Sequence, residues 1–493
     1  MAVAFTITHL TLIYLSLGPA KVGANDVGLY AWWVGQGDRS SDWPGISDDW
    51  VYPVGALAPL VLAAVFGTSM PTENDPAGLA GVLTMPPTYL LTWCVMITLI
   101  NLVTTVVVAR RFGLPSASAP LIGWFVFLML LGPCAIARLD AVMMPLALIA
   151  LVAAAARPAL ASVLLTCSAW VKVSGGAALI PLFAIGRSWR DRIVRVVAPA
   201  ALTCLVVVLL QWAAGGQWRF LTSFIHAEAG RGLQIEAVLA TPVVLSHAAH
   251  GEQSWVWNDG LSTYETWGAG AELAIRVSDG AMALMALAVG LLTWLARNRA
   301  GAALLVGTLA TMTGLIVTHK VGSPQFIAWL APAAVAALCA GHRLRFWLPV
   351  SFALLVTAAL TGMLYPWGYS AFLSGDRAML TVWTIRNLLL VAVFAATLAE
   401  LVRLWRADPP PKATLRRIQL RPNRGGVAGP IEHNHLPRDR REPQNDAANH
   451  GEHTEDHALV PSREQAQAQQ RSAHDERAED DPRDHLGQAD PDI

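Results

Sequence analysis

Residues 86–109 read PPTYLLTWCVMITLINLVTTVVVA: no side chain in this stretch is charged, and Arg110 and Arg111 follow it directly. A helix of about 20 apolar residues spans the hydrocarbon core of a bilayer. The stretch therefore predicts a transmembrane helix that ends in a basic loop. Eleven further apolar stretches lie at 3–20, 117–136, 141–156, 159–171, 174–186, 196–213, 279–297, 301–318, 325–341, 345–364 and 381–404. Together they predict an all-α polytopic membrane protein with about twelve transmembrane helices, the fifth and sixth being a short pair broken near Lys172.

Composition excludes an ordinary soluble protein. Hydrophobic residues make up 54% of the chain and charged residues only 14%, whereas about 25% of a typical globular domain is charged. Residues 407–493 hold 29 of the 70 charged residues and none of the 39 aromatic ones. A segment of this kind cannot bury enough apolar surface to fold. We therefore expect a transmembrane domain over 1–406 and a disordered polar tail over 407–493.

Arginines predict the orientation of the bundle. They gather in the short loops of one side, at Arg110, Arg111, Arg157, Arg187, Arg190, Arg192, Arg195, Arg297, Arg299, Arg343, Arg345, Arg403 and Arg406. Basic loops stay in the cytoplasm, so this side and the tail are predicted to be inside. The segments 21–85 and 214–278 then lie on the outer face of the cell membrane.

Two apolar stretches allow more than one interpretation. Residues 51–70 are long enough to cross, but one crossing would move every later basic loop outside, so we expect a hairpin on the outer side. A true span, balanced by an error elsewhere, is the alternative. The first stretch resembles a signal peptide cleaved after Ala24, but no basic residues precede it, which favours a retained helix.

The first outer segment contains a candidate catalytic group. Asp26, Tyr30 and Trp33 are spaced i, i+4, i+7, which on a helix places one carboxylate and two aromatic rings on one face. A carboxylate beside an aromatic platform can position a sugar hydroxyl and take its proton. The alternative is that Asn25 and Asp26 only cap a helix.

Cationic residues form a second group of candidates. Lys172 lies in the predicted helix break, where a lone lysine is costly unless it meets an anion or water. The connection 318–326, THKVGSPQF, places His319, Lys320 and Gln325 beside a helix that starts with proline, an arrangement that suits an anion. Arg231 and Glu236 lie in a glycine-containing outer loop, where arginine can bind phosphate or form a salt bridge.

Two aspartates complete the set of candidates. Asp49 follows Asp48, and paired carboxylates can bind a metal or share acid–base work, although they more often lie in a solvated turn. Asp140 stands in Arg138-Leu139-Asp140, where the arginine and the aspartate are expected to neutralise each other. No Cys/His spacing typical of zinc is found, so we predict no metal and no cofactor, with the aspartate pair as the one alternative.

The chain resembles the C-type membrane glycosyltransferases, and most closely glycosyltransferase family 87, the polyprenyl-phosphate-mannose-dependent mannosyltransferases of actinobacteria and relatives. The resemblance covers about residues 1–405. It rests on N-D-V-x-L-Y-x-x-W at 25–33, Y-P at 52–53, R-L-D at 138–140, A-W-V-K-V at 169–173, R-G-L-Q-I-E at 231–236 and S-P-Q-F-x-x-W-L-x-P at 323–332. Two motifs depart from the family: Val54 replaces the second proline of Y-P-P, and R-L-D stands where relatives often show a Gly-Gln version.

This resemblance implies a reaction and roles for single residues. A polyprenyl-phosphate sugar, expected to be mannose, donates its sugar with inversion to a lipid-linked glycan or glycolipid. Asp26 matches the aspartate of the first outer loop, the general base, whereas His319 and Lys320 match the region that contacts the donor phosphate, with Lys172 assisting. Arg231 is a further phosphate ligand, and Tyr30, Trp33, Asp49, Asp140, Glu236 and Gln325 are candidate substrate contacts.

The expected partners are therefore the lipid donor, the glycan acceptor and membrane lipid, not nucleic acid. A transporter or a flippase for lipid-linked glycans is the main alternative, although such proteins usually show two related halves. A non-catalytic scaffold is a weaker one, because it does not explain why histidine, lysine and aspartate gather on the outer side.

Overall fold

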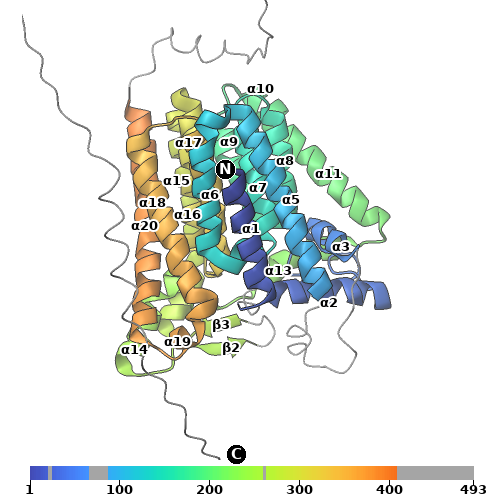
Figure 1. The fold of residues 1–493 in the computed structure, drawn as a ribbon, viewed down its shortest axis with the longest axis vertical. Helices are drawn as coiled ribbons and strands as arrows, with labels where there is room; N and C mark the ends of the chain where they lie inside the picture. Colours follow the sequence, from blue (N-terminus) through green and yellow to red (C-terminus); the bar gives the residue numbers. More distant parts are fainter. Residues whose placement is uncertain (20–24, 66–86, 259–262, 408–493) are drawn as a thin grey trace, which may run out of the picture. The chain divides into compact units, whose positions relative to one another are not determined.

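The apolar stretches form a bundle of helices that run side by side along one axis (Figure 1). The computed structural model describes residues 1–19, 25–65, 87–258 and 263–407, and these belong to one compact unit. The bundle contains α1 (Ala2–Leu17), α5 (Pro87–Phe112), α6 (Leu114–Leu131), α7 (Asp140–Ala154), α8 (Pro158–Val171), α9 (Leu179–Ala184), α11 (Ala198–Ala213), α15 (Ala269–Leu295), α16 (Ala300–Thr318), α17 (Ala331–Cys339), α18 (Leu344–Gly362) and α20 (Arg377–Arg406).

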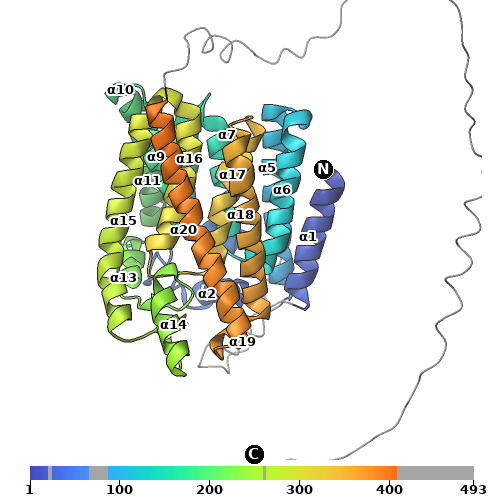
Figure 2. The same cartoon turned by 90° about the vertical axis from the view of Figure 1, so that its left-hand side faces the viewer.

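The twelve predicted spans are largely helical over their described residues, but the predicted number of spans is wrong. Among the described residues, six helical stretches are long and apolar enough to cross a membrane: Pro87–Phe112, Leu114–Ala135, Trp189–Ala213, Ala269–Thr318, Leu344–Trp367 and Arg377–Arg406. The stretch Ala269–Thr318 contains both α15 and α16, which lie side by side (Figure 2). The other apolar helices have 10–17 residues.

Breaks in the backbone explain this difference. The apolar run after Ser323 begins as the 3-10 helix η8 (Pro324–Leu330) and becomes α-helical only in α17. Likewise, α8 ends at Lys172, whose backbone is extended (φ −155°, ψ 127°), before the 3-10 helix η4 (Val173–Ala178) leads into α9. The break predicted at Lys172 and the short helices on either side of it are thus confirmed, whereas hydropathy did not reveal the 3-10 start at Pro324.

The surface of the bundle is apolar where helices face outward. Leu202, Leu205 and Leu210 of α11 are 62%, 52% and 65% exposed, and Leu284 and Leu287 of α15 are about as exposed. Soluble proteins do not expose contiguous apolar faces of this size. Together with the six long helices, this surface defines a polytopic membrane protein built mainly of helices.

The two ends of the helix bundle carry different elements. One end of the bundle carries α10 (Trp189–Arg192), the π-helical turn η5 (Ile193–Val197) and the last turn of α20 (Figure 1). Here Glu400 of α20, whose side chain is 7% exposed, accepts hydrogen bonds from Arg343 (2.8 Å) and from two nitrogens of Arg403 (2.6 Å each). This clamp fixes the end of α20 to the start of α18.

The opposite end, here called the site end, carries the remaining elements. They are α2 (Asn25–Ser40), η2 (Val54–Ala56), α3 (Leu57–Ala64), α12 (Trp218–Leu221), α13 (Ser223–Ala229), η6 (Val238–Ala240), α14 (Thr241–His250), η9 (Met363–Trp367) and α19 (Tyr369–Leu373). A small antiparallel sheet of order β1-β3-β2 joins them, with β1 (Leu233–Gln234), β2 (Val256–Asn258) and β3 (Thr263–Thr266). Trp257 is the cross-strand partner of Tyr264.

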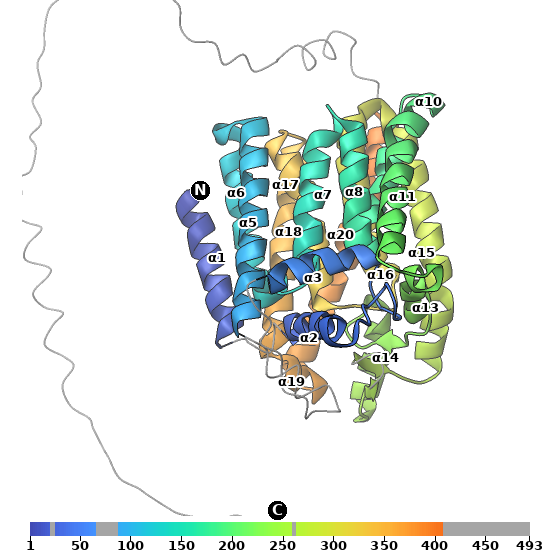
Figure 3. The ribbon, with the colours of Figure 1, turned by 90° about the vertical axis from the view of Figure 1, so that its right-hand side faces the viewer.

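The first arm of the predicted hairpin at 51–70 lies at this end. η2 and α3 have 3 and 8 residues, and α3 lies across the bundle helices (Figure 3). At about 1.5 Å per residue they are too short to cross a bilayer. The hydroxyl of Tyr89 donates to the carbonyl of Leu60 (2.9 Å) and ties α3 to α5. Residues 66–70, the predicted return, and 408–493, nearly all of the predicted tail, lie outside the described residues.

Candidate functional site

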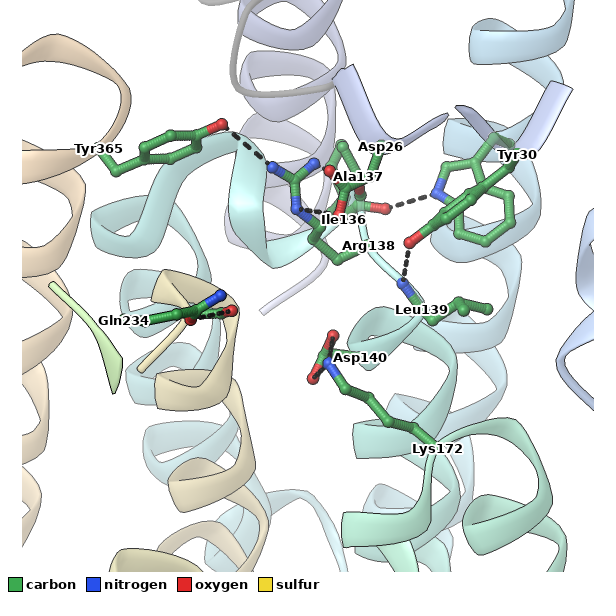
Figure 4. A network of polar contacts seen from close by, with 12 residues as sticks. Asp26, Tyr30, Ile136, Ala137, Arg138, Leu139, Asp140, Lys172, Gln234 and Tyr365 are labelled. Atoms are coloured by element: carbon green, nitrogen blue, oxygen red, sulfur yellow. Dashed lines mark hydrogen bonds and ion pairs between the residues drawn. The ribbon is translucent and has the colours of Figure 1, made fainter. Parts of the chain in front are cut away.

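A charged pair joins α2 to the loop before α7. The Nε of Arg138 lies 3.0 Å from a carboxylate oxygen of Asp26, and the arginine side chain is 4% exposed while that of Asp26 is 32% exposed. Arg138 also donates to the carbonyl of Ala137 (3.0 Å) and to the hydroxyl of Tyr365 (3.3 Å) (Figure 4). A buried arginine therefore holds a carboxylate that remains accessible.

Asp140 has a different partner, so the prediction that Arg138 and Asp140 neutralise each other is wrong. The ammonium of Lys172 donates to both carboxylate oxygens of Asp140, at 2.9 and 3.0 Å. The indole N–H of Trp329 donates to one of them at 2.5 Å. Asp140 is the first residue of α7, whereas Arg138 precedes the helix, and the two side chains point apart (Figure 4).

The break at Lys172 positions this second pair. Lys172 lies 4.7 Å above the ring of Phe326 and 5.6 Å from that of Trp329, both in η8. After Lys172 the chain turns back and passes close to α8. A Cβ on Gly175 would therefore lie 2.7 Å from the backbone of Ser168. Only glycine fits there, so the small residues after Lys172 serve the turn.

Tyr30 and Trp33, which were predicted as substrate contacts, pack against other residues of the protein. α2 is helical from Asn25, which confirms the predicted spacing. The buried hydroxyl of Tyr30 accepts a hydrogen bond from the backbone N–H of Leu139 (3.2 Å), and its ring stacks on Trp33 at 6.0 Å. Tyr30 thus fixes α2 to the loop of Arg138, and both rings belong to an aromatic cluster with Trp50 and Tyr52.

A second charged group, the Glu228 cluster, consists of Glu228, Arg231, His319 and Lys320. The two oxygens of Glu228 lie 3.0 Å from Arg231 Nε and 3.3 Å from His319 Nε2. Lys320 is buried and donates to the carbonyl of Ala229 (3.0 Å). The structure therefore brings three of the four predicted phosphate ligands together, whereas Lys172 pairs with Asp140.

Both ring nitrogens of His319 have polar neighbours. Its Nδ1 lies 3.0 Å from the backbone nitrogen of Val321 and 3.3 Å from the Val321 carbonyl oxygen, and its Nε2 faces Glu228. A proton on Nε2 lets the neutral ring accept from the amide and donate to the carboxylate. Burial lowers the pKa of His319, and the charges of Lys320 and Arg231 lower it further, although Glu228 opposes them. The imidazole is therefore a neutral hydrogen-bond donor at pH 7.

Strand β1 binds the loop that carries His319 and Lys320. The backbone N–H of Gln234 donates to the carbonyl of Lys320 (3.0 Å), and its side-chain oxygen accepts from the N–H of Gly322 (3.1 Å). A Cβ on Gly322 would lie 2.2 Å from the backbone nitrogen of Ala237, so glycine is required. Gln325, a predicted substrate contact, is buried in η8.

Glu236 lies in a separate buried cluster. Its carboxylate accepts a hydrogen bond from the hydroxyl of Tyr369, and its backbone carbonyl accepts one from Arg386 (2.9 Å). Arg386 also binds Asn387 (2.8 Å). Burial raises the pKa of Glu236.

Asp49, in contrast, is exposed, and its backbone N–H donates a hydrogen bond to the side chain of Asp48 (2.8 Å).

Tyr52 lies among the charges of the site. Burial raises the pKa of its hydroxyl, the negative charges of Asp26 and Asp140 raise it further, and Arg231 and Arg138 oppose them. The Asp26–Arg138 and Asp140–Lys172 pairs themselves lie next to each other (Figure 4). Among the described residues, no group of three or more His, Cys, Asp or Glu side chains gathers as a metal site would.

Sequence reasoning missed Arg138, Trp329 and Tyr365 as members of the site. Arg138 belongs to the motif R-L-D but was predicted to pair with Asp140. Trp329 belongs to the motif S-P-Q-F-x-x-W, and no role was predicted for it. Tyr365 belongs to no motif, and only the fold brings it to Arg138.

Comparison of the chain with protein families, curated proteins and solved structures finds no match. The resemblance to family 87 thus stays a prediction.

Proposed function

We propose that the chain is an integral-membrane hexosyltransferase that moves a sugar, expected to be mannose, from a polyprenyl-phosphate donor to a lipid-linked or envelope glycan. The site end then faces the outside of the cell membrane, and the arginine-rich end faces the cytoplasm. The observation that carries the proposal is the accessible carboxylate of Asp26, held by buried Arg138 next to the buried Asp140–Lys172 pair.

Asp26 is the proposed general base. Its carboxylate takes the proton of an acceptor hydroxyl while the hydroxyl oxygen forms a bond to C1 of the donor sugar. The bond between C1 and the phosphate oxygen breaks, and polyprenyl phosphate leaves from the opposite face, so the configuration at C1 inverts. Arg138 is a positioning residue, because its contacts to Ala137 and Tyr365 fix the direction from which it holds Asp26.

The Glu228 cluster is the proposed site of the leaving phosphate. Arg231, His319 and Lys320 supply N–H donors, which stabilise charge that develops on a departing oxygen. Glu228 now occupies two of these donors with a carboxylate, and its side chain is 42% exposed. The donor phosphate would take the place of this carboxylate. Lys172 has one N–H beyond the two that Asp140 accepts.

Replacement of Glu228 by glutamine should therefore improve donor binding. The neutral amide competes less well with phosphate for Arg231, and an exposed pair of this kind is worth up to about 1 kcal/mol. We expect the KM for the donor to fall about two- to fivefold with little change in kcat. Glu272→Gln, which removes the exposed pair with Arg276 on α15, is the matched control. An unchanged or higher KM in Glu228→Gln would exclude Glu228 from the phosphate position.

Transfer is tested with the purified protein in lipid vesicles. Labelled polyprenyl-phosphate-mannose and extracted envelope glycolipids are supplied, and labelled product is measured over time. Formation of a glycosidic product with inverted configuration supports a transferase. If no product forms with donors that carry mannose, glucose or arabinose, the proposal fails. Movement of intact lipid-linked glycan across the same vesicles would then identify a flippase.

A further inference from the structure

A continuous series of aromatic rings leads away from Arg138. The hydroxyl of Tyr365 accepts from Arg138, whose guanidinium carbon lies 5.9 Å from the Tyr365 ring. The next ring, Tyr369, lies 5.3 Å from Tyr365, and Tyr264 lies 5.9 Å from Tyr369. Trp257 comes last, at 4.7 Å from Tyr264. We call these four residues the ring ladder.

The ring ladder crosses from one packing unit to another. Tyr365 packs against the large core of the bundle, whereas Tyr264 and Tyr369 pack against a smaller core that contains Leu233 and Trp383. Trp257 belongs to neither core. All four rings are nevertheless only partly buried, so neither core covers them completely.

The chemistry of the ring ladder combines apolar faces with polar groups. Three of its members carry phenol hydroxyls, and the hydroxyl of Tyr369 donates to the buried carboxylate of Glu236. Rings with a polar tip suit ligands that are apolar on one side and hydroxylated on the other. A sugar ring has this character, because C–H groups cover its faces and hydroxyls project from its edge.

We propose that the ring ladder binds the carbohydrate part of the acceptor, and that this acceptor contains more than one sugar ring. The inference rests on the proposed function, since the ladder starts at the arginine that holds Asp26. The reacting sugar lies at Tyr365, which Arg138 connects to Asp26, and the sugars that precede it extend over Tyr369 and Tyr264 toward Trp257. The far end of the ladder therefore selects acceptor length and takes no part in proton transfer.

Binding is tested without the donor, so that its result is independent of catalysis. The full-length protein in nanodiscs is titrated with mannose, mannotriose and maltotriose by calorimetry. We expect at least one trisaccharide to bind about tenfold more tightly than the monosaccharide. Trp257→Ala should weaken this binding about two- to tenfold, the range for one aromatic contact, whereas Trp257→Phe should keep most of it. Trp218→Ala, which removes an 80% exposed indole outside the ladder, is the control.

The outcomes separate the two proposals. Trisaccharide binding that depends on Trp257, without any transfer, keeps the ring ladder and removes the transferase. Transfer with equal binding of mono- and trisaccharides, or with no effect of Trp257→Ala, overturns the ring ladder alone. Quenching of Trp257 fluorescence by brominated lipids, absent in Trp257→Phe, would also overturn it, because the ring would then face the membrane.

Discussion

Replacing Lys172 by methionine is expected to lower the free energy of unfolding by about 3–5 kcal/mol, the cost of leaving one partner of a buried pair without the other. The side chain of Asp140 is 2% exposed, and Lys172 supplies two of its hydrogen bonds. Methionine keeps most of the volume of the lysine stem but removes the charge. The measurement is unfolding by denaturant in detergent micelles, followed by circular dichroism.

The double variant Lys172→Met/Asp140→Asn tests the physical cause. It removes both charges, and the asparagine side chain still accepts the hydrogen bond of Trp329, so most of the lost stability should return. Arg276→Met is the control on exposed α15, where the partner Glu272 is solvated and little change is expected. A single variant that is as stable as the double variant would show that Asp140 does not need Lys172.

Replacing Asp26 by asparagine is expected to reduce sugar transfer about 100- to 10,000-fold, the usual contribution of a general base. Asparagine has the same shape, and its oxygen can still accept the hydrogen bond of Arg138, but it cannot take a proton. The loss should therefore appear in kcat, with the KM of the donor nearly unchanged. Initial rates in the vesicle assay measure both constants.

Asp38→Asn is the matched control for this prediction, since Asp38 is exposed near the far end of the same helix. Arg138→Met distinguishes the role of the base from that of the positioning residue. This variant keeps the carboxylate of Asp26 but removes the contact that orients it, so activity should fall less than in Asp26→Asn. Equal transfer by Asp26→Asn and the unaltered protein would move the base to another group. Asp140 is then a poor candidate, because Lys172 and Trp329 already occupy its oxygens.

The helices could be predicted because burial in lipid and burial in a core demand the same apolar stretches. The break at Lys172 could also be predicted, from Ser174, Gly175 and Gly176 after a charged residue. The number of long spans could not, since Pro324–Leu330 is as apolar as an α-helix yet forms a 3-10 helix. Hydropathy measures composition and is insensitive to how tightly the backbone is wound.

Part of the candidate site could be predicted as single residues, but the pairs that these residues form could not. Asp26, His319 and Lys320 stood out because ionisable groups near a membrane are costly. Their partners lie far away in sequence: Asp26 binds Arg138, and His319 binds Glu228. Arg138 and Asp140, two residues apart in sequence, were instead predicted to pair with each other. Their side chains point apart because α7 begins at Asp140. Pairing of this kind is decided by tertiary packing.

The clamp on Glu400 has a consequence for how the chain can change. Arg343 and Arg403 hold the last turn of α20 from within the bundle, and a chain shortened after Ala407 would keep every one of these contacts. These contacts involve only side chains between residues 343 and 403, so none of their atoms is removed when the sequence after Ala407 changes.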